Sequence, residues 1–187
     1  MPRSGEQVRL RLQRAALDLY RKKGFDETTT AEIAARARTT ERTFFRHFAD
    51  KREVLFGGEA VVREALVQAV RGVPGKPPPL EVLLRAFRAV VPMLEENRPL
   101  SEPRAKVIAA HPALRERELA KHAAMNEAVA AALEARGVDA RRATLAAQVA
   151  MAAFGQATQS WLDDPKPGLD ALVVQAFADF RELAKRR

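Results

Sequence analysis

The sequence of 187 residues contains no cysteine, one tryptophan and one tyrosine. The absence of cysteine excludes a disulfide framework and any metal site built on thiolates. No stretch approaches the roughly 20 consecutive apolar residues that cross a membrane. Near the N-terminus, Arg9, Arg11 and Arg14 interrupt any apolar core of a signal peptide. We therefore expect a cytoplasmic protein with no membrane partner.

Sequence patterns of catalysis are missing as well. Gly57-Gly58 lacks the preceding strand that a phosphate-binding glycine loop requires, and no serine lies in a nucleophile-elbow pattern. The histidines at 47, 111 and 122 lack the neighbours of a triad or a metal site. We therefore expect no catalytic residues, no metal and no cofactor, and predict that the protein is not an enzyme.

The residues that are abundant favour helices. Alanine, leucine, arginine and glutamate dominate, and the valines fall within helical periods, so we expect an all-α fold of about nine helices. The net charge of +8 is distributed unevenly, because residues 1–56 carry a net +5 and residues 57–187 a net +3. Concentration of positive charge on less than a third of the chain suits a polyanionic partner.

The stretch from Thr28 to Lys51 predicts two short helices joined by a tight turn. Thr29 followed by Glu32 is the pattern of a capping box, in which each side chain satisfies a free backbone N–H of the other residue. The first helix is expected over 31–37, where small alanines allow close approach of a second helix.

The second helix of the pair is expected over 41–47, with Thr40 as its cap. Phe44 and Phe48 lie four residues apart and should point into a small core, which leaves a polar outer face. This arrangement is typical of a helix-turn-helix whose second helix enters the major groove of DNA. A helical hairpin with a solvated basic face is the alternative.

Short motifs at fixed spacings cover about the first 56 residues: Gly24-Phe25, Thr28, Thr29-Thr30, Glu32-Ile33-Ala34, Thr43-Phe44-Phe45-Arg46-His47-Phe48 and Lys51. Together they resemble the N-terminal DNA-binding domain of the TetR family of transcriptional regulators. The chain departs from the family pattern at Arg38, where glycine is usual, and at Phe45, where tyrosine is usual. The remainder of the chain resembles the family in its helical layout alone.

The chemistry of the side chains and the resemblance together suggest how the predicted helix-turn-helix meets DNA. Arg42 can pair with guanine, Thr43 can meet a base or a phosphate, and Arg46 is a second candidate for base contact. Phe45 is expected to pack on sugar. The predicted phosphate contacts are Thr30, Thr40, His47 and Lys51.

The region after residue 56 is expected to form a larger helical domain that binds an effector and forms a homodimer. We place the boundary at Gly57-Gly58 inside a helix predicted over 51–71, which gives domains 1–56 and 57–187. Helices expected over about 139–162 and 169–185 carry more apolar and small residues than one domain core needs. This excess favours a two-fold dimer through a four-helix bundle, which the resemblance also implies. The alternative is that both helices close the core of a monomer.

The resemblance also implies a small-molecule effector, and the residue types suggest an apolar one. Four polar residues on largely apolar helices can orient a ligand or simply pair across the dimer: Asn126, Gln148, Gln156 and Gln159. Five bulky, adaptable residues are expected to face inward and are our candidate pocket residues: Phe87, Val91, Met125, Phe154 and Trp161. The same residue types also line ordinary cores, and on sequence alone a core is the favoured interpretation.

The sequence therefore predicts a DNA-binding transcriptional regulator, most simply a repressor released from a palindromic operator by an effector. Two other classes of protein fit parts of the pattern. A non-specific architectural DNA-binding protein would use the basic charge without reading sequence. A helical ligand carrier or enzyme would make the basic N-terminal region incidental.

Overall fold

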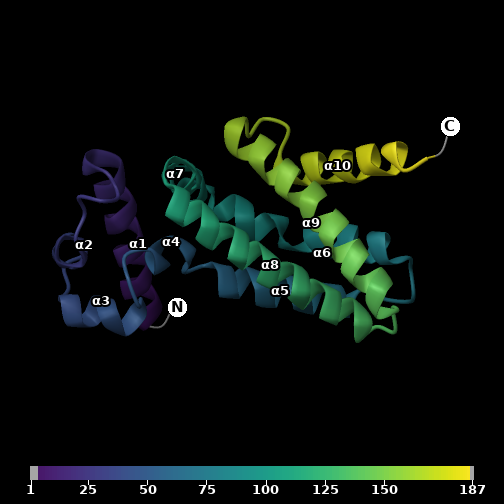
Figure 1. Ribbon diagram of the computed structural model, residues 1–187, viewed down its shortest axis with the longest axis horizontal. Coiled ribbons are helices and arrows are strands. Elements are labelled where there is room, and N and C mark those ends of the chain that lie inside the picture. The colour runs from purple at the N-terminus through teal and green to yellow at the C-terminus, as the bar shows by residue number, and fades with distance from the viewer. Residues whose placement is uncertain (1–3, 186–187) are drawn as a thin grey trace. The chain divides into compact units, whose positions relative to one another are not determined.

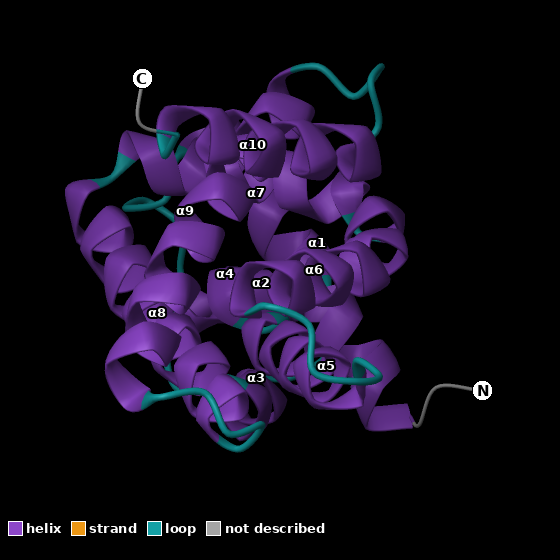
Figure 2. Ribbon diagram, turned by 90° about the vertical axis from the view of Figure 1, so that its right-hand side faces the viewer, coloured by secondary structure: helices purple, strands orange, loops and turns teal. Residues whose placement is uncertain are grey.

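The computed structural model describes residues 4–185, and every regular element in this range is a helix (Figures 1 and 2). The predicted all-α class is confirmed. No helix within this range is long and apolar enough to cross a membrane. The helices are α1 (Ser4–Lys23), α2 (Thr30–Arg36), α3 (Glu41–His47), α4 (Glu53–Phe56), α5 (Glu59–Gly72), α6 (Pro79–Glu96), α7 (Arg98–Ala110), α8 (Pro112–Glu134), α9 (Ala140–Asp163) and α10 (Leu169–Leu183).

The single helix predicted over 51–71 is divided in the structure, so the described residues form ten helices rather than nine. α4 ends at Phe56 and α5 begins at Glu59, with Gly57 and Gly58 between them. A Cβ at Gly57 would lie 2.8 Å from both Gln13 Nε2 and Phe48 Cε1, whereas a Cβ at Gly58 would meet nothing within 4 Å. The ring of Phe48, together with the side chain of Gln13 on α1, therefore leaves no room for a side chain at position 57.

The chain divides into two compact units. The first contains the residues up to Glu59 together with Pro99–Leu119, and the second contains Ala60–Arg98 together with the residues from Ala120 onward. The first unit thus includes, besides the range 1–56, α7 and the first residues of α8. Apolar packing explains this membership, because Val107, Ile108 and Leu114 are buried in the same core cluster as the helix-turn-helix.

The core of the first unit joins α1 to the two short helices that follow it. α1 packs against α2 and α4, and α2 packs against α3. Leu12, Ile33 and Phe44 supply one fully buried side chain each from α1, α2 and α3. Helices as short as α2 and α3 are marginal in isolation, so this packing, together with their caps, holds them in place.

The second unit is built around α6, α9 and α10, with α10 packed against both of the others. Figure 1 shows α10 running back beside α9 after the turn that joins them. Phe87 of α6 is fully buried, with its ring stacked on Phe154 of α9 at 4.4 Å between centroids and edge-on to Phe177 of α10 at 6.0 Å. This aromatic cluster is the centre of a continuous apolar core.

Candidate nucleic-acid interface

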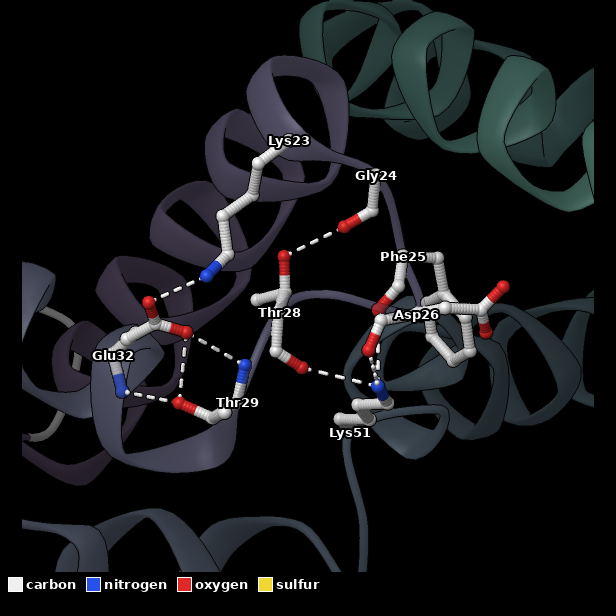
Figure 3. Close-up of polar contacts among 8 residues, drawn as sticks. All are labelled: Lys23, Gly24, Phe25, Asp26, Thr28, Thr29, Glu32 and Lys51. Atoms are coloured by element: carbon white, nitrogen blue, oxygen red, sulfur yellow. Dashed lines mark hydrogen bonds and ion pairs between the residues drawn. The ribbon is translucent and has the colours of Figure 1, made fainter.

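The N-terminus of α2 is fixed by the predicted capping box, which the structure confirms. Glu32 N–H donates to Thr29 Oγ1 at 3.2 Å, and Thr29 N–H donates to Glu32 Oε2 at 2.9 Å (Figure 3). Lys23 at the end of α1 donates to Glu32 Oε1 at 2.5 Å. This lysine contact first, and the bonds from Thr29 second, lower the pKa of Glu32 to about 2. The carboxylate therefore stays charged at neutral pH and holds the start of α2 next to the end of α1.

The turn between α2 and α3 places Arg38 in a left-handed backbone conformation, with φ of +54°. Thr39 N–H donates to Ala34 O and Arg38 N–H donates to Ala35 O, each at 3.0 Å. This pair of bonds is a Schellman motif, in which glycine normally occupies the position of Arg38. The departure from glycine noted in the sequence therefore leaves the turn tight but makes its backbone strained.

α3 has one face in the core and one face exposed. Thr40 caps the helix by accepting a hydrogen bond from Thr43 N–H at 3.2 Å, as predicted. Phe44 is fully buried. Arg42 and Arg46 are exposed, and neither guanidinium has a hydrogen bond or ion pair with any residue in the range 4–185. The helix thus carries two exposed arginines without partners among the described residues, on a backbone fixed by its cap and by Phe44.

The other predicted contacts on and before α3 differ in how free they are. The ring of Phe45 is 53% exposed. Thr43 Oγ1 lies 3.0 Å from Thr40 Oγ1, and Thr30 Oγ1 donates to the carboxylate of Glu41. The contact between the two threonine hydroxyls lies within the cap of α3. The bond from Thr30 to Glu41 joins the first turn of α2 to the first turn of α3.

His47 is the last residue of α3. Its ring is half-buried, and Nε2 has no hydrogen-bond partner among the described residues. Burial first, and the charges of Arg46 and Arg9 second, lower the pKa of His47 below its usual value. The imidazole is therefore neutral near pH 7.

Lys51 has a structural position that the sequence did not reveal. Its Nζ donates to the carbonyl oxygens of Phe25, Asp26 and Thr28 at 3.0, 2.9 and 3.0 Å (Figure 3). These bonds use all three ammonium protons, so in the structure Lys51 binds the loop before α2 instead of offering a donor to a phosphate.

The backbone of Lys51 is held as well. Its carbonyl oxygen accepts a hydrogen bond from Tyr20 Oη at 2.6 Å. Burial first, and the charge of Asp50 second, raise the pKa of the Tyr20 phenol, which therefore stays protonated and able to donate. Lys51 thus joins α1, the loop before α2 and the approach to α4.

α4 is held near both ends by residues that sequence analysis placed in the other domain. Arg117 of α8 donates to Glu53 Oε1 at 2.6 and 3.0 Å. Arg104 of α7 donates to Leu55 O at 3.4 Å, and its burial lowers the pKa of its guanidinium. Positions 104 and 117 are about 50 to 65 residues from their partners, so no local pattern could have indicated these contacts.

The five predicted pocket residues all lie in the second unit and are all buried in its apolar core. Phe87 and Phe154 are the stacked pair described above. The ring of Trp161 lies beneath the guanidinium of Arg98, at 5.5 Å from its centroid. Next to Met125, the side-chain Oδ1 of Asn126 is buried and lacks a hydrogen-bond partner among the described residues. The structure thus brings together an apolar cluster and places one unsatisfied acceptor on α8.

A capped helix pair with an exposed basic second helix, followed by a helical domain, defines a DNA-binding regulator of the helix-turn-helix class. Residues 12–56 match the family described as bacterial regulatory proteins, tetR family, and residues 77–184 match the MftR C-terminal domain. The chain belongs to the TetR family of transcriptional regulators. Members of this family are DNA-binding regulators, most often repressors that small molecules control.

Similarity to individual proteins agrees with this assignment. The chain is 39% identical over 84 residues to the HTH-type transcriptional regulator TcmR of Streptomyces glaucescens. That match covers 45% of this chain and 37% of the relative's length. A sequence match of this extent concerns part of each protein.

Two solved structures share the fold over nearly the whole chain. SmeT of Stenotrophomonas maltophilia, in a complex with triclosan, has a TM-score of 0.62 at 19% identity and covers 92% of this chain and 90% of its own. Thermus thermophilus FadR, in complex with lauroyl-CoA, has a TM-score of 0.59 at 24% identity and covers 96% of each chain. At these identities the likeness concerns the fold.

Proposed function

We propose that this chain is a repressor that binds a pseudo-palindromic operator as a homodimer and leaves it when a small-molecule effector binds. The observation that carries the proposal is the construction of α3. Thr40 caps this helix and Phe44 anchors it, while Arg42 and Arg46 stay exposed without partners among the described residues. A helix with free arginines on a fixed backbone is suited to reading base edges.

Arg42 is the primary base-reading residue in this proposal, because its planar guanidinium can bond O6 and N7 of guanine together. Arg46, one turn later, reads a second position, and Thr43 contacts a base or the adjacent phosphate. Phe45 packs its exposed ring on sugar. The phosphate contacts come from Thr30, Thr40 and His47, with the N-termini of the short helices behind them.

The homodimer is proposed to form through α9 and α10. Leu145 of α9 is 62% exposed and Val174 of α10 is 40% exposed. Between them along the chain, Gly155 is exposed and a Cβ there would meet nothing within 4 Å, so a helix from a second chain can approach closely. On its operator the dimer is proposed to present two copies of α3 to successive major grooves, about 34–36 Å apart, which is one helical turn of DNA.

The effector is proposed to be largely apolar and to bind among Phe87, Val91, Met125, Phe154 and Trp161. Aromatic and methionine side chains adapt to a ligand by changing rotamer. The unsatisfied Asn126 Oδ1 would accept a hydrogen bond from the ligand, which removes the cost of a buried acceptor without a partner. SmeT and FadR, which share this fold, were solved with triclosan and lauroyl-CoA, each of which has an apolar part.

Regulation then follows from differential binding, because an effector can shift the protein toward a state that holds the two α3 helices at the wrong separation. α8 carries Met125 and also Arg117, the residue that holds the start of α4. We place the coupling in this helix and in the Gly57-Gly58 break. The functional division between residues 1–56 and 57–187 is proposed to lie at that break. A repressor of this kind acts in the cytoplasm and performs no catalysis.

The base-reading role is tested by Arg42→Ala on the operator selected by the wild-type protein. We expect a loss of about 1–3 kcal/mol in binding and relaxed preference at one position in each half-site. Arg21→Ala, which removes an exposed arginine of α1, is the matched control for charge. Equal weakening on the operator and on random duplex by Arg42→Ala would reassign this residue to phosphate contact.

A further inference from the structure

An open groove of about 600 Å³ lies between α1 and the end of α2, apart from the exposed face of α3. Its lining comes from the middle of α1, the last residues of α2 and the turn that follows. None of the predicted DNA-contacting residues contributes to it. The lining residues are Arg11, Arg14, Ala15, Asp18, Arg36, Ala37 and Arg38.

The groove is strongly positive, because four arginines face one carboxylate. That carboxylate, Asp18, is already neutralised by Arg36, with which it forms an ion pair, and by Lys22 at 3.4 Å. Arg11 uses its Nε in a long bond of 3.4 Å to Ala37 O, which leaves its terminal nitrogens free. Uncompensated positive charge therefore remains in the groove.

Two of the arginines are uncommitted. The guanidinium groups of Arg14 and Arg38 make no hydrogen bond or ion pair with any residue that the structure describes. Their like charges, added to that of Arg11, repel one another in the free protein. An anion in the groove would relieve this repulsion and satisfy several guanidinium donors at once.

Arg38 contributes a second, independent observation, because its backbone is strained. The end of α8 has the same Schellman bonds, from Gly137 N–H to Glu134 O and from Val138 N–H to Leu133 O, and there the left-handed residue is Gly137 with φ of +86°. An arginine at the corresponding position of α2 costs backbone energy that glycine would avoid. Residues held in such conformations are concentrated at functional sites.

We propose that this groove is a phosphate-binding site of the protein, with Arg14 and Arg38 as its principal ligands. Arginine forks match phosphate oxygens in pairs, and Ala15 and Ala37 leave room for the groups to enter. The phosphates can belong to the DNA backbone or to a free polyphosphate-bearing molecule. Arg38 lies two residues before Thr40, the cap of α3, so a DNA backbone is one possible source of the phosphates, and this source rests on the proposed function.

The test compares the wild type with the double variant Arg14→Gln/Arg38→Gln. Glutamine keeps the side chain long and polar and removes the charge. Arg21→Gln on α1, at an exposed position outside the groove, is the control. Circular dichroism and the thermal midpoint establish that all three proteins are folded.

In the first arm, the DNA dissociation constant is measured against salt concentration, on the selected operator or, if selection yields no motif, on random duplex. Removal of one phosphate-binding arginine lowers the steepness of log Kd against log [salt] by about 0.9. The double variant removes two such arginines per chain, so the slope for a dimer should fall by about 3.6 if both bind the backbone.

In the second arm, inorganic tripolyphosphate is titrated into the protein without DNA, and heat is recorded. A free phosphate source predicts binding to wild type and to Arg21→Gln, and at least tenfold weaker binding to the double variant. This arm needs no operator, so it stays informative if the proposed repressor function fails. The site would be overturned if the double variant matched the wild type in both arms, or if Arg21→Gln changed either quantity as much as the double variant does.

Discussion

The first compact unit fixes short helices with polar contacts to individual backbone atoms, whereas the second unit packs long helices through apolar side chains. Lys51 illustrates the first mode, with three carbonyl oxygens around one ammonium group. Phe87 illustrates the second, buried between two other aromatic rings. The difference teaches that a surface that reads DNA needs fixed geometry, which directional bonds provide, while a domain that accepts a ligand needs packing that can adapt.

The largest effect is expected from opening the core of the second unit. Phe87→Ala should lower the free energy of unfolding by about 3–5 kcal/mol, because it leaves a cavity between Phe154 and Phe177. Urea denaturation at fixed protein concentration measures this change. Val61→Ala, at a side chain that is 63% exposed, is the control and should change stability by less than about 0.5 kcal/mol. A decrease below about 1 kcal/mol for Phe87→Ala would mean that the second unit does not depend on this cluster.

A smaller effect is expected at the glycine pair in the first unit. Gly57→Ala should destabilise by about 1–3 kcal/mol, since its methyl group would overlap the ring of Phe48 and the end of Gln13. Gly58→Ala enters open space and should be neutral or stabilising by up to about 1 kcal/mol. Thermal denaturation of the two variants tests whether position 57 is closely packed and position 58 is not. Equal behaviour would show that position 57 is not tightly packed against Phe48 and Gln13.

Polar bonds can be compared between the units with double-mutant cycles. For Glu53 and Arg117, whose bonds are partly shielded from water, we expect a coupling energy of about 1 kcal/mol. For Arg88 and Asp170 in the second unit, which are more exposed, the coupling should be smaller. Unfolding free energies of the alanine single and double variants supply both values. A larger coupling at Arg88–Asp170 would contradict the contrast drawn between the units.

The smallest effect concerns the strained turn. Arg38→Gly should stabilise the protein by about 0.5–1 kcal/mol, because glycine accepts the left-handed conformation without a Cβ clash. Gly137→Ala, at the corresponding position after α8, should destabilise by a similar amount. Paired thermal melts test both changes. Destabilisation by Arg38→Gly would show that the arginine side chain supports the fold of the turn.

Features determined by neighbouring residues were predictable from the sequence. Thr29, Glu32 and Thr40 form the predicted caps, and the range 41–47 is the observed α3, because capping and helical periodicity involve residues within one or two turns. The all-α class followed from the abundance of helix-forming residues and from helical periodicity, which are also local properties of the sequence.

Features that depend on distant contacts were not predictable. The inward position of the Lys51 ammonium depends on carbonyl groups more than twenty residues earlier. The association of α7 and the start of α8 with the first unit depends on Arg104, Arg117 and a few apolar side chains. The helical sequence pattern of these segments does not indicate which unit they pack against. The need for glycine at position 57 depends on the side chains of Gln13 and Phe48, which lie nearby in the fold but not in the local sequence.

The central claim is that α3 reads a DNA sequence as one half of a two-fold assembly. The most direct measurement is selection from a random duplex library at about 150 mM salt, followed by sequencing of the bound DNA. The account predicts an enriched inverted repeat whose half-sites lie one helical turn or more apart. Recovery of no motif by a folded dimer would contradict the claim, and would leave α2 and α3 as a basic helical hairpin.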